Sequence, residues 1–117
     1  MIKLEIPLKL PSLNEYINSC RGNKYGGASM KKQVEKNISR FINKLPKFDN
    51  PIKIRFIWME ANKRRDLDNI CFAKKFILDA MVKCGKLSDD NRKYVCGFED
   101  KFEYGDEYKV VLEIDEV

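Results

Sequence analysis

Residues 63–84, with the sequence KRRDLDNICFAKKFILDAMVKC, are the stretch around which the rest of the chain is arranged. Three consecutive basic residues run straight into two aspartates, Asp66 and Asp68, where a helical pattern begins. A second acidic pair, Asp89 and Asp90, follows the end of that pattern. Basic side chains attract phosphate, whereas clustered carboxylates repel it unless a hard cation such as Mg²⁺ lies between them. The stretch therefore predicts metal-assisted cleavage of a phosphodiester.

Strands are predicted on both sides of this stretch by alternating apolar and polar residues. Residues 52–60, IKIRFIWME, place their large apolar side chains on one face. Residues 2–10 alternate in the same way, and Pro7 favours an edge position or a bulge for them. Residues 94–102 and 108–114 alternate again and are joined by a glycine-containing turn, which predicts an antiparallel hairpin.

Two helices are predicted from apolar residues at helical spacing. One covers residues 29–45 and stops at Pro46, and the other covers residues 68–84 and is capped by Gly85. The loop before the first helix contains a glycine pair that is expected to supply flexibility. The resulting order is β-α-β-α-β-β. It predicts that residues 1–117 form a single α+β domain with two main helices on a mostly antiparallel sheet.

Composition narrows the function classes. The chain of 117 residues has a net charge of +5 and an isoelectric point near 9.0, which suits a polyanionic partner. It contains no histidine, which excludes Ser-His-Asp and Cys-His triads, imidazole bases and His-ligated zinc. Its four cysteines form no close pair and are predicted to be reduced, intracellular and mostly buried. No apolar run is long enough for a membrane span, and the N-terminus is unlike a signal peptide, so a cytoplasmic protein is expected.

The helix over residues 68–84 is predicted to have a buried and an exposed face. At about 100° per residue, a core stripe centred on Ile77 leaves Asp68, Lys75 and Asp79 within about 20° of the opposite pole. Lys74 falls beside the core stripe, so Lys75 is the lysine that shares a face with the start of the helix. It lies about 10 Å along the axis from Asp68, and a long lysine side chain points back in that direction.

Each acidic feature also has an ordinary structural interpretation. Either aspartate of the first pair could cap the helix, and the second pair could be turn residues. Lys75 and Asp79 could form a surface ion pair across one helical turn. One cap explains one aspartate, however, and not two that are preceded by three cations. The signal lies in the combination of a basic run, paired aspartates, a lysine on the same face and a second acidic pair.

This combination resembles the RusA family of Holliday junction resolvases, small endodeoxyribonucleases common in prophages and phages. The resemblance covers most of the chain. It is carried by Pro11-Ser12-Leu13-Asn14-Glu15-Tyr16, Arg65-Asp66-Leu67-Asp68-Asn69, Lys74-Lys75-Phe76-Ile77-Leu78-Asp79-Ala80, Lys83-Cys84-Gly85 and Asp89-Asp90.

The resemblance implies that Asp66, Asp68 and Asp90 are catalytic carboxylates that bind Mg²⁺, with Mn²⁺ as a substitute. Asp89 and Asn69 would support them. The metal would lower the pKa of a bound water and neutralise charge on the phosphoryl oxygens, and the products would carry 5′-phosphate and 3′-hydroxyl ends.

The family's essential lysine matches Lys75 when the comparison is anchored on Asp79. Anchoring on Asn69 instead places Phe72 at the lysine position, because the span between Asn69 and Asp79 is about three residues longer here than in the family pattern. The helical-face argument decides for Lys75, which would stabilise the transition state or help to position the nucleophile.

The resemblance further implies a homodimer that binds a four-way DNA junction and cuts two symmetric strands. Backbone contacts to DNA are expected from five basic residues, namely Lys63, Arg64, Arg65, Arg21 and Lys24. The cations on the helix over residues 29–45 are either a solvated face or a further DNA surface. Two other functions stay open: a catalytically inactive protein of the same fold that binds branched DNA, and a structural or partner-binding domain whose charges serve no nucleic acid.

Overall fold

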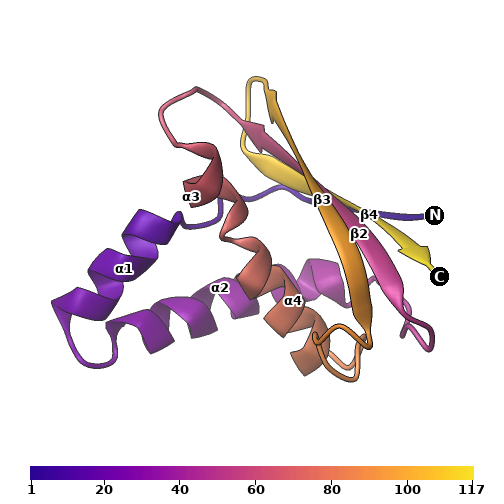
Figure 1. Cartoon of the computed structure of the whole chain (residues 1–117). Helices are drawn as coiled ribbons and strands as arrows, with labels where there is room; N and C mark the ends of the chain where they lie inside the picture. The colour runs from indigo at the N-terminus through magenta and orange to yellow at the C-terminus, as the bar shows by residue number, and fades with distance from the viewer.

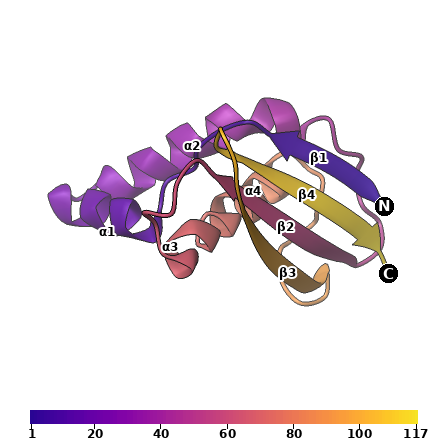
Figure 2. The ribbon, with the colours of Figure 1, turned by 90° about the horizontal axis from the view of Figure 1, so that it is seen from above.

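The computed structural model describes all 117 residues. The chain forms a four-stranded mixed sheet, and the helices lie on one side of it (Figure 1). The α+β class predicted from the sequence is confirmed. Seen from above, α1 and the adjoining end of α2 extend beyond the sheet, while α4 lies against it (Figure 2). None of the helices combines the length and the hydrophobicity that a membrane-spanning segment requires.

The sheet has the order β1-β4-β2-β3. Its strands are β1 (Ile2–Ile6), β2 (Ile52–Glu60), β3 (Val95–Tyr104) and β4 (Lys109–Glu116). β1 is an edge strand, in line with the prediction from Pro7, although it ends at Ile6 and not at residue 10. β4 pairs antiparallel with both β1 and β2, whereas β2 and β3 run parallel.

The predicted hairpin between the last two strands is therefore wrong. β3 and β4 are not neighbours, because β2 lies between them. The chain leaves β3, passes over the end of β2 and returns as β4. Gly105 makes this crossing, since its N–H donates to the carbonyl of Glu60 at 3.0 Å and a Cβ on it would lie 3.2 Å from the sulfur of Met59.

Helix α1 (Leu13–Gly22) occupies residues for which the sequence predicted no regular structure. Ser12 caps it: the Ser12 hydroxyl accepts from the Glu15 N–H at 3.1 Å, and the Glu15 carboxylate accepts from the Ser12 N–H at 3.4 Å. This reciprocal capping box satisfies two N–H groups at the start of the helix. Arg21 consequently lies in a helix and not in a loop.

Helix α2 (Gly26–Ile42) begins at the glycine pair, so these glycines do not form a flexible boundary. They allow α1 and α2 to approach closely. A Cβ on Gly26 would lie 2.0 Å from the carbonyl oxygen of Ser19, and a Cβ on Gly27 would lie 2.3 Å from the sulfur of Cys20. The predicted apolar face of the helix is confirmed, with Val34, Ile38 and Ile42 buried.

The helix predicted over residues 68–84 is divided into α3 (Leu67–Cys71) and α4 (Lys74–Lys83). The division is a tight turn in which Ala73 and Lys75 donate their N–H groups to residues three positions earlier, Ile70 and Phe72. The predicted C-cap is confirmed: Gly85 has a φ of +74°, and Lys86 donates to the carbonyl of Met81 at 2.9 Å, a Schellman motif.

The core fills the space between the helices and the inner face of the sheet. The predicted inner residues of β2 are buried, and so is the predicted stripe from Ile70 to Met81. The cysteines were predicted to be mostly buried, and this is wrong, because Cys20 and Cys96 are exposed and Cys71 and Cys84 are half-buried. All four thiols are free.

Candidate functional site

Asp66 and Asp68 lie at the first turn of α3, where β2 has ended and the chain turns toward the helices. Both side chains are exposed. Asp66 stands at the N-cap position, but its carboxylate makes no capping hydrogen bond. The Asp68 carboxylate accepts only the backbone N–H of Asn69, at 3.0 Å. The structural role proposed for an aspartate cap is therefore not used, and both carboxylates are free to bind another group.

A buried ion pair fixes the segment that carries these aspartates. The guanidinium of Arg65 donates two hydrogen bonds of 2.7 Å to the carboxylate of Glu60 and a third, of 2.8 Å, to the carbonyl of Leu10. Glu60 ends β2 and its side chain is only 5% exposed. This fork holds the start of α3 against the end of the sheet.

The fork changes the interpretation of Arg65. The sequence assigned this residue to the DNA surface, yet its side chain is 15% exposed and its guanidinium is occupied inside the protein. We therefore assign Arg65 to the support of the site. The local sequence pattern does not predict this ion pair, because Glu60 belongs to the end of a predicted strand and Arg65 belongs to a basic run.

Asn69 also supports α3. Its side-chain oxygen accepts the backbone N–H of Asn14 at 3.1 Å, which ties α3 to the first turn of α1. Tyr16, two residues further along α1, packs on Phe72 with ring centroids 5.3 Å apart and on Phe76 with centroids 5.9 Å apart. The Pro-Ser-x-Asn-x-Tyr segment thus packs directly on the acidic motif.

Lys75, in the first turn of α4, contacts Asp90 of the second acidic pair. Its ammonium lies 3.3 Å from Oδ2 of Asp90 and 3.2 Å from Oδ1 of Asp79. The side chain of Lys75 is 58% exposed, whereas that of Asp90 is 24% exposed. Two residues that the sequence predicts for one site, Lys75 and Asp90, are therefore in contact. Phe72, the other candidate for the lysine position, packs in the aromatic cluster with Tyr16.

Lys74 is directed elsewhere, as the helical phase predicted. Its ammonium donates to Asp100 of β3 at 2.6 Å and lies 4.2 Å from the ring centre of Phe98. Asp100 also accepts the indole N–H of Trp58 at 2.9 Å. Lys74 therefore ties α4 to the sheet.

Asp79 does not lie at the exposed pole of the helix, contrary to the prediction. Its side chain is 15% exposed because Lys31 of α2 covers it, with the ammonium 2.8 Å from Oδ2. The network continues to Glu35, which is buried in α2 and pairs with Lys31 at 3.9 Å and with Lys83.

The network shifts the pKa values of its members. Partial burial acts to raise the pKa of Asp79, but the hydrogen bonds and charges of Lys31 and Lys75 outweigh it, so the pKa lies below its ordinary value. A hydrogen bond to Asp79 is the largest influence on each lysine, and it raises the pKa of Lys31 and of Lys75. Both lysines are thus held as cations.

Asp89 braces the loop that carries Asp90. One of its carboxylate oxygens accepts the N–H of Asp90 at 2.7 Å, and the other accepts the side-chain amide of Asn91 at 3.2 Å. This arrangement agrees with the turn role considered from the sequence. It leaves Asp90, and not Asp89, directed toward Lys75.

The carboxylates Asp66, Asp68 and Asp90 are of the kind that Mg²⁺ prefers, since all their donor atoms are oxygen. Their arrangement does not yet form a metal centre. No group of three or more carboxylate or thiol side chains lies close enough together to hold a metal ion. Asp90 is instead neutralised by the Lys75 ammonium. As arranged, these residues do not fit the metal that the family resemblance implies.

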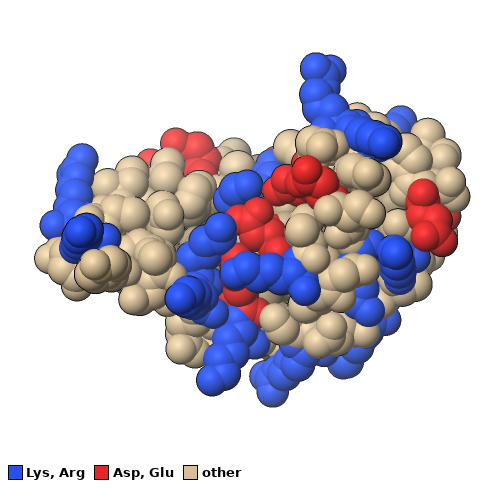
Figure 3. Space-filling model, turned by 90° about the horizontal axis from the view of Figure 1, so that it is seen from below, with Lys and Arg blue, Asp and Glu red and all other residues tan.

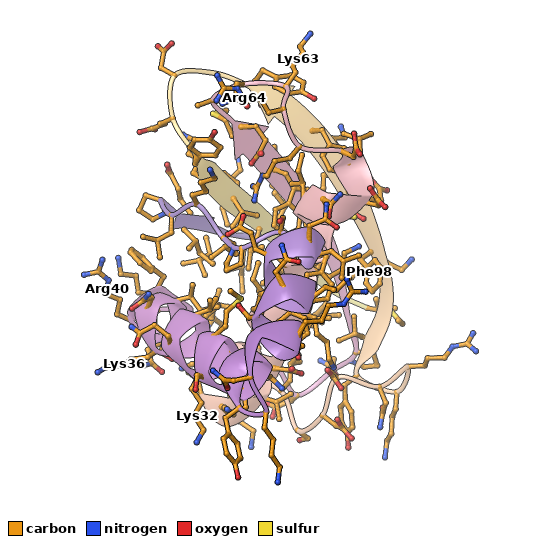
Figure 4. The ribbon with its side chains drawn as sticks, turned by 90° about the vertical axis from the view of Figure 1, so that its left-hand side faces the viewer. Lys32, Lys36, Arg40, Lys63, Arg64 and Phe98 are labelled. Atoms are coloured by element: carbon orange, nitrogen blue, oxygen red, sulfur yellow. The ribbon has the colours of Figure 1, made fainter.

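The remaining residues predicted to bind DNA are exposed but do not lie together. Lys63 and Arg64 project from the end of the sheet, at the opposite end of the view from Lys32 and Lys36 of α2 (Figure 4). Lys63 lies over the ring of Tyr104 at 5.0 Å. Arg21 and Lys24 lie at the far end of α1. From below, acidic side chains occupy the middle of the molecule with lysines and arginines around them (Figure 3).

The chain matches no protein-family model and no curated protein.

Proposed function

We propose that this chain is a metal-dependent, structure-selective endodeoxyribonuclease that resolves Holliday junctions by paired symmetric incisions, acting as a homodimer. The observation that carries the proposal is the contact between Lys75 and Asp90. These residues are 15 positions apart and were assigned to one site by the order of residues along the chain. Their meeting at the first turn of α4 supports a common site.

The support extends to the first acidic pair. Asp66 and Asp68 are exposed, make almost no internal hydrogen bonds, and stand on a segment fixed by the fork between Glu60 and Arg65. Free carboxylates on a rigid segment are what a hydrolytic metal site requires. In the proposed nuclease, Asp66, Asp68 and Asp90 hold the metal, and Lys75 faces the phosphate.

The proposal requires a rearrangement. Asp90 must exchange the Lys75 ammonium for a place near Asp66 and Asp68, because the three carboxylates form no metal-binding group in this structure. After this exchange Lys75 would keep one acidic partner, because its ammonium also lies 3.2 Å from Oδ1 of Asp79.

The test is cleavage of a labelled synthetic four-way junction with Mg²⁺ or Mn²⁺, by wild type and by Asp68→Asn. Paired symmetric incisions that vanish in Asp68→Asn, while junction binding persists, are the expected result. Asp106→Asn is the matched control, because it makes the same change at an exposed aspartate in the connection between β3 and β4. It should cut like wild type.

A second candidate is a catalytically inactive protein that binds branched DNA. The lack of a three-carboxylate group favours it. This protein would bind a four-way junction equally well in EDTA and in Mg²⁺ and leave it intact. Tight binding without cutting in either metal therefore selects this candidate over the nuclease.

A further inference from the structure

The outer face of α2 carries cations that take no part in the network described above. Lys32, Lys36 and Arg40 are spaced four residues apart, so they follow one side of the helix over about 12 Å. All three are exposed and none forms an ion pair. They project together from the side of α2 (Figure 4).

No negative charge on α2 balances this row. Glu35 is the only acidic residue of the helix, and it is buried on the inner side against Lys31 and Lys83. The neighbouring segment Pro7–Pro11 contains no acidic residue either. Some surface cations of this protein have an acidic partner, as Arg55 does in Glu99 at 3.1 Å and in Glu113 at 3.3 Å. The three cations of the α2 row have none.

The row borders a hollow of about 360 Å³ that is lined by Leu8, Lys36, Asn37 and Arg40. The side-chain oxygen of Asn37 accepts a hydrogen bond from Gln33 at 3.1 Å, so its amide N–H groups are left as donors. Arg40 stacks over Phe41 at 4.7 Å, which uses the face of the guanidinium and leaves its in-plane N–H groups free. The polar lining is therefore made of donors alone.

We propose that this hollow binds a phosphate of the DNA backbone through Lys36, Asn37 and Arg40, and that Lys32 contacts the same strand beside it. Three donor groups with two positive charges suit a phosphodiester, and the spacing of the row spans several consecutive phosphates. The inference rests on the proposed function in one respect, because the ligand it assigns is a duplex arm of branched DNA.

The assignment separates two tasks. The row contacts only the backbone, so it contributes affinity and orientation and carries no sequence information. Junction specificity and cutting belong to the site at Lys75 and Asp90. A variant of the row should therefore weaken binding to a linear duplex and to a junction alike.

The experiment compares two double variants that remove the same charge. Lys36→Gln/Arg40→Gln removes it from the hollow, and Lys53→Gln/Lys101→Gln removes it from β2 and β3, where both lysines are exposed and unpaired. Binding of a four-way junction and of a linear duplex is measured by fluorescence anisotropy over a range of salt concentrations. Asn37→Asp, which places a negative charge in the hollow, is the third variant.

The α2 double variant is expected to reduce the slope of log Kd against log salt by about 2, one unit for each lost phosphate contact. The control pair should leave the slope unchanged, and Asn37→Asp should weaken binding to both DNAs. Equal effects of the two pairs would show a net-charge effect and overturn the proposal. No effect of the α2 pair, or no DNA binding by wild type, would overturn it as well.

The outcome is independent of catalysis. If the α2 double variant lowers the slope of log Kd against log salt as expected but the wild type cuts no junction in Mg²⁺ or Mn²⁺, the nuclease proposal fails. The proposal of a DNA-binding surface on α2 is then retained. If wild type cuts junctions and the α2 pair changes no slope, the nuclease stands and this surface fails.

Discussion

The ion pairs around the site differ in the elements that they join. Lys75 and Asp79 lie four residues apart and are neighbours on one helix. The fork between Glu60 and Arg65 joins the end of β2 to the segment before α3. Lys31 covers Asp79 across the contact between α2 and α4.

The fork is expected to be a major stabilising feature. Arg65→Ala leaves the buried Glu60 carboxylate without its partner and should lower the free energy of unfolding by about 3–5 kcal/mol. Arg64→Ala, one residue earlier and exposed, should change it by less than about 0.5 kcal/mol. Urea denaturation followed by circular dichroism measures both. Similar stability of the two variants would show that the fork contributes little.

The ion pairs of Asp79 predict that the stability of the folded protein falls at acidic pH. A lowered pKa means that the folded protein binds fewer protons than the unfolded chain, so stability rises with pH in that range. The contribution is complete above the ordinary aspartate pKa of about 3.9 and is lost as the pH falls below it, through the folded pKa.

Thermal unfolding of wild type and Asp79→Asn across this pH range checks the prediction. The wild type should lose more of its melting temperature than the variant as the pH falls below about 4. Asp49→Asn changes an exposed aspartate that forms no ion pair, so its melting temperature should vary with pH as that of the wild type does. Parallel curves for wild type and Asp79→Asn would mean that the network does not stabilise the fold.

At the scale of elements, the sequence contains local signals that fit more than one structure. The capping box of α1 is written in the sequence as Ser12-Leu13-Asn14-Glu15, yet the segment lacks a strong apolar stripe and its helix has no buried residue. The glycine pair predicts a flexible loop, but glycine permits two opposite uses, freedom of the backbone and close packing. Only the position of α1 against α2 decides between them.

The contact between α1 and α2 predicts an asymmetry between the two glycines. Gly27→Ala brings a Cβ against the sulfur of Cys20, and Gly26→Ala brings one against the backbone carbonyl of Ser19. Each change should destabilise the protein by about 1–3 kcal/mol. Cys20→Ala should restore much of the loss in Gly27→Ala, because it removes the atom in conflict.

The matching change at the other glycine should not help. Ser19→Ala removes a hydroxyl, but the carbonyl that opposes a Cβ on Gly26 remains. Chemical denaturation of the four single and two double variants gives the coupling energies. Equal rescue in both pairs would show that the two helices simply move apart.

At the scale of the whole molecule, the sequence predicts the fold class but not the topology. Alternation identifies all four strands, because one face of the sheet is buried against helices. Neighbours in a sheet are not encoded by alternation, and a short connection favours a hairpin. The two strands differ in burial: β4 alternates between half-buried and buried residues from Lys109 to Ile114, whereas β3 is mostly exposed, as suits an edge strand.

The same limit applies to the site. The order of acidic and basic residues along the chain predicts the participants, but their distances depend on the turn between α3 and α4 and on the loop that returns Asp90 to Lys75. The structure places Lys75, Asp79 and Asp90 together, while Asp66 and Asp68 remain free at the start of α3.

The proposed homodimer makes a prediction that concerns the assembly. One chain carries one acidic site, so paired incisions require two active subunits at one junction. Subunits of wild type and Asp68→Asn mixed in equal amounts and refolded together give about half of the dimers as mixed pairs. On a cruciform plasmid, these pairs should nick one strand where the wild type makes two cuts and releases linear DNA.

The measured quantity is the ratio of nicked to linear plasmid at early times. The mixture should raise this ratio above that of wild type diluted to the same number of active sites, because each mixed dimer holds the junction and cuts only once. Equal ratios would mean that each subunit cuts on its own and that the two incisions are not made by one bound dimer.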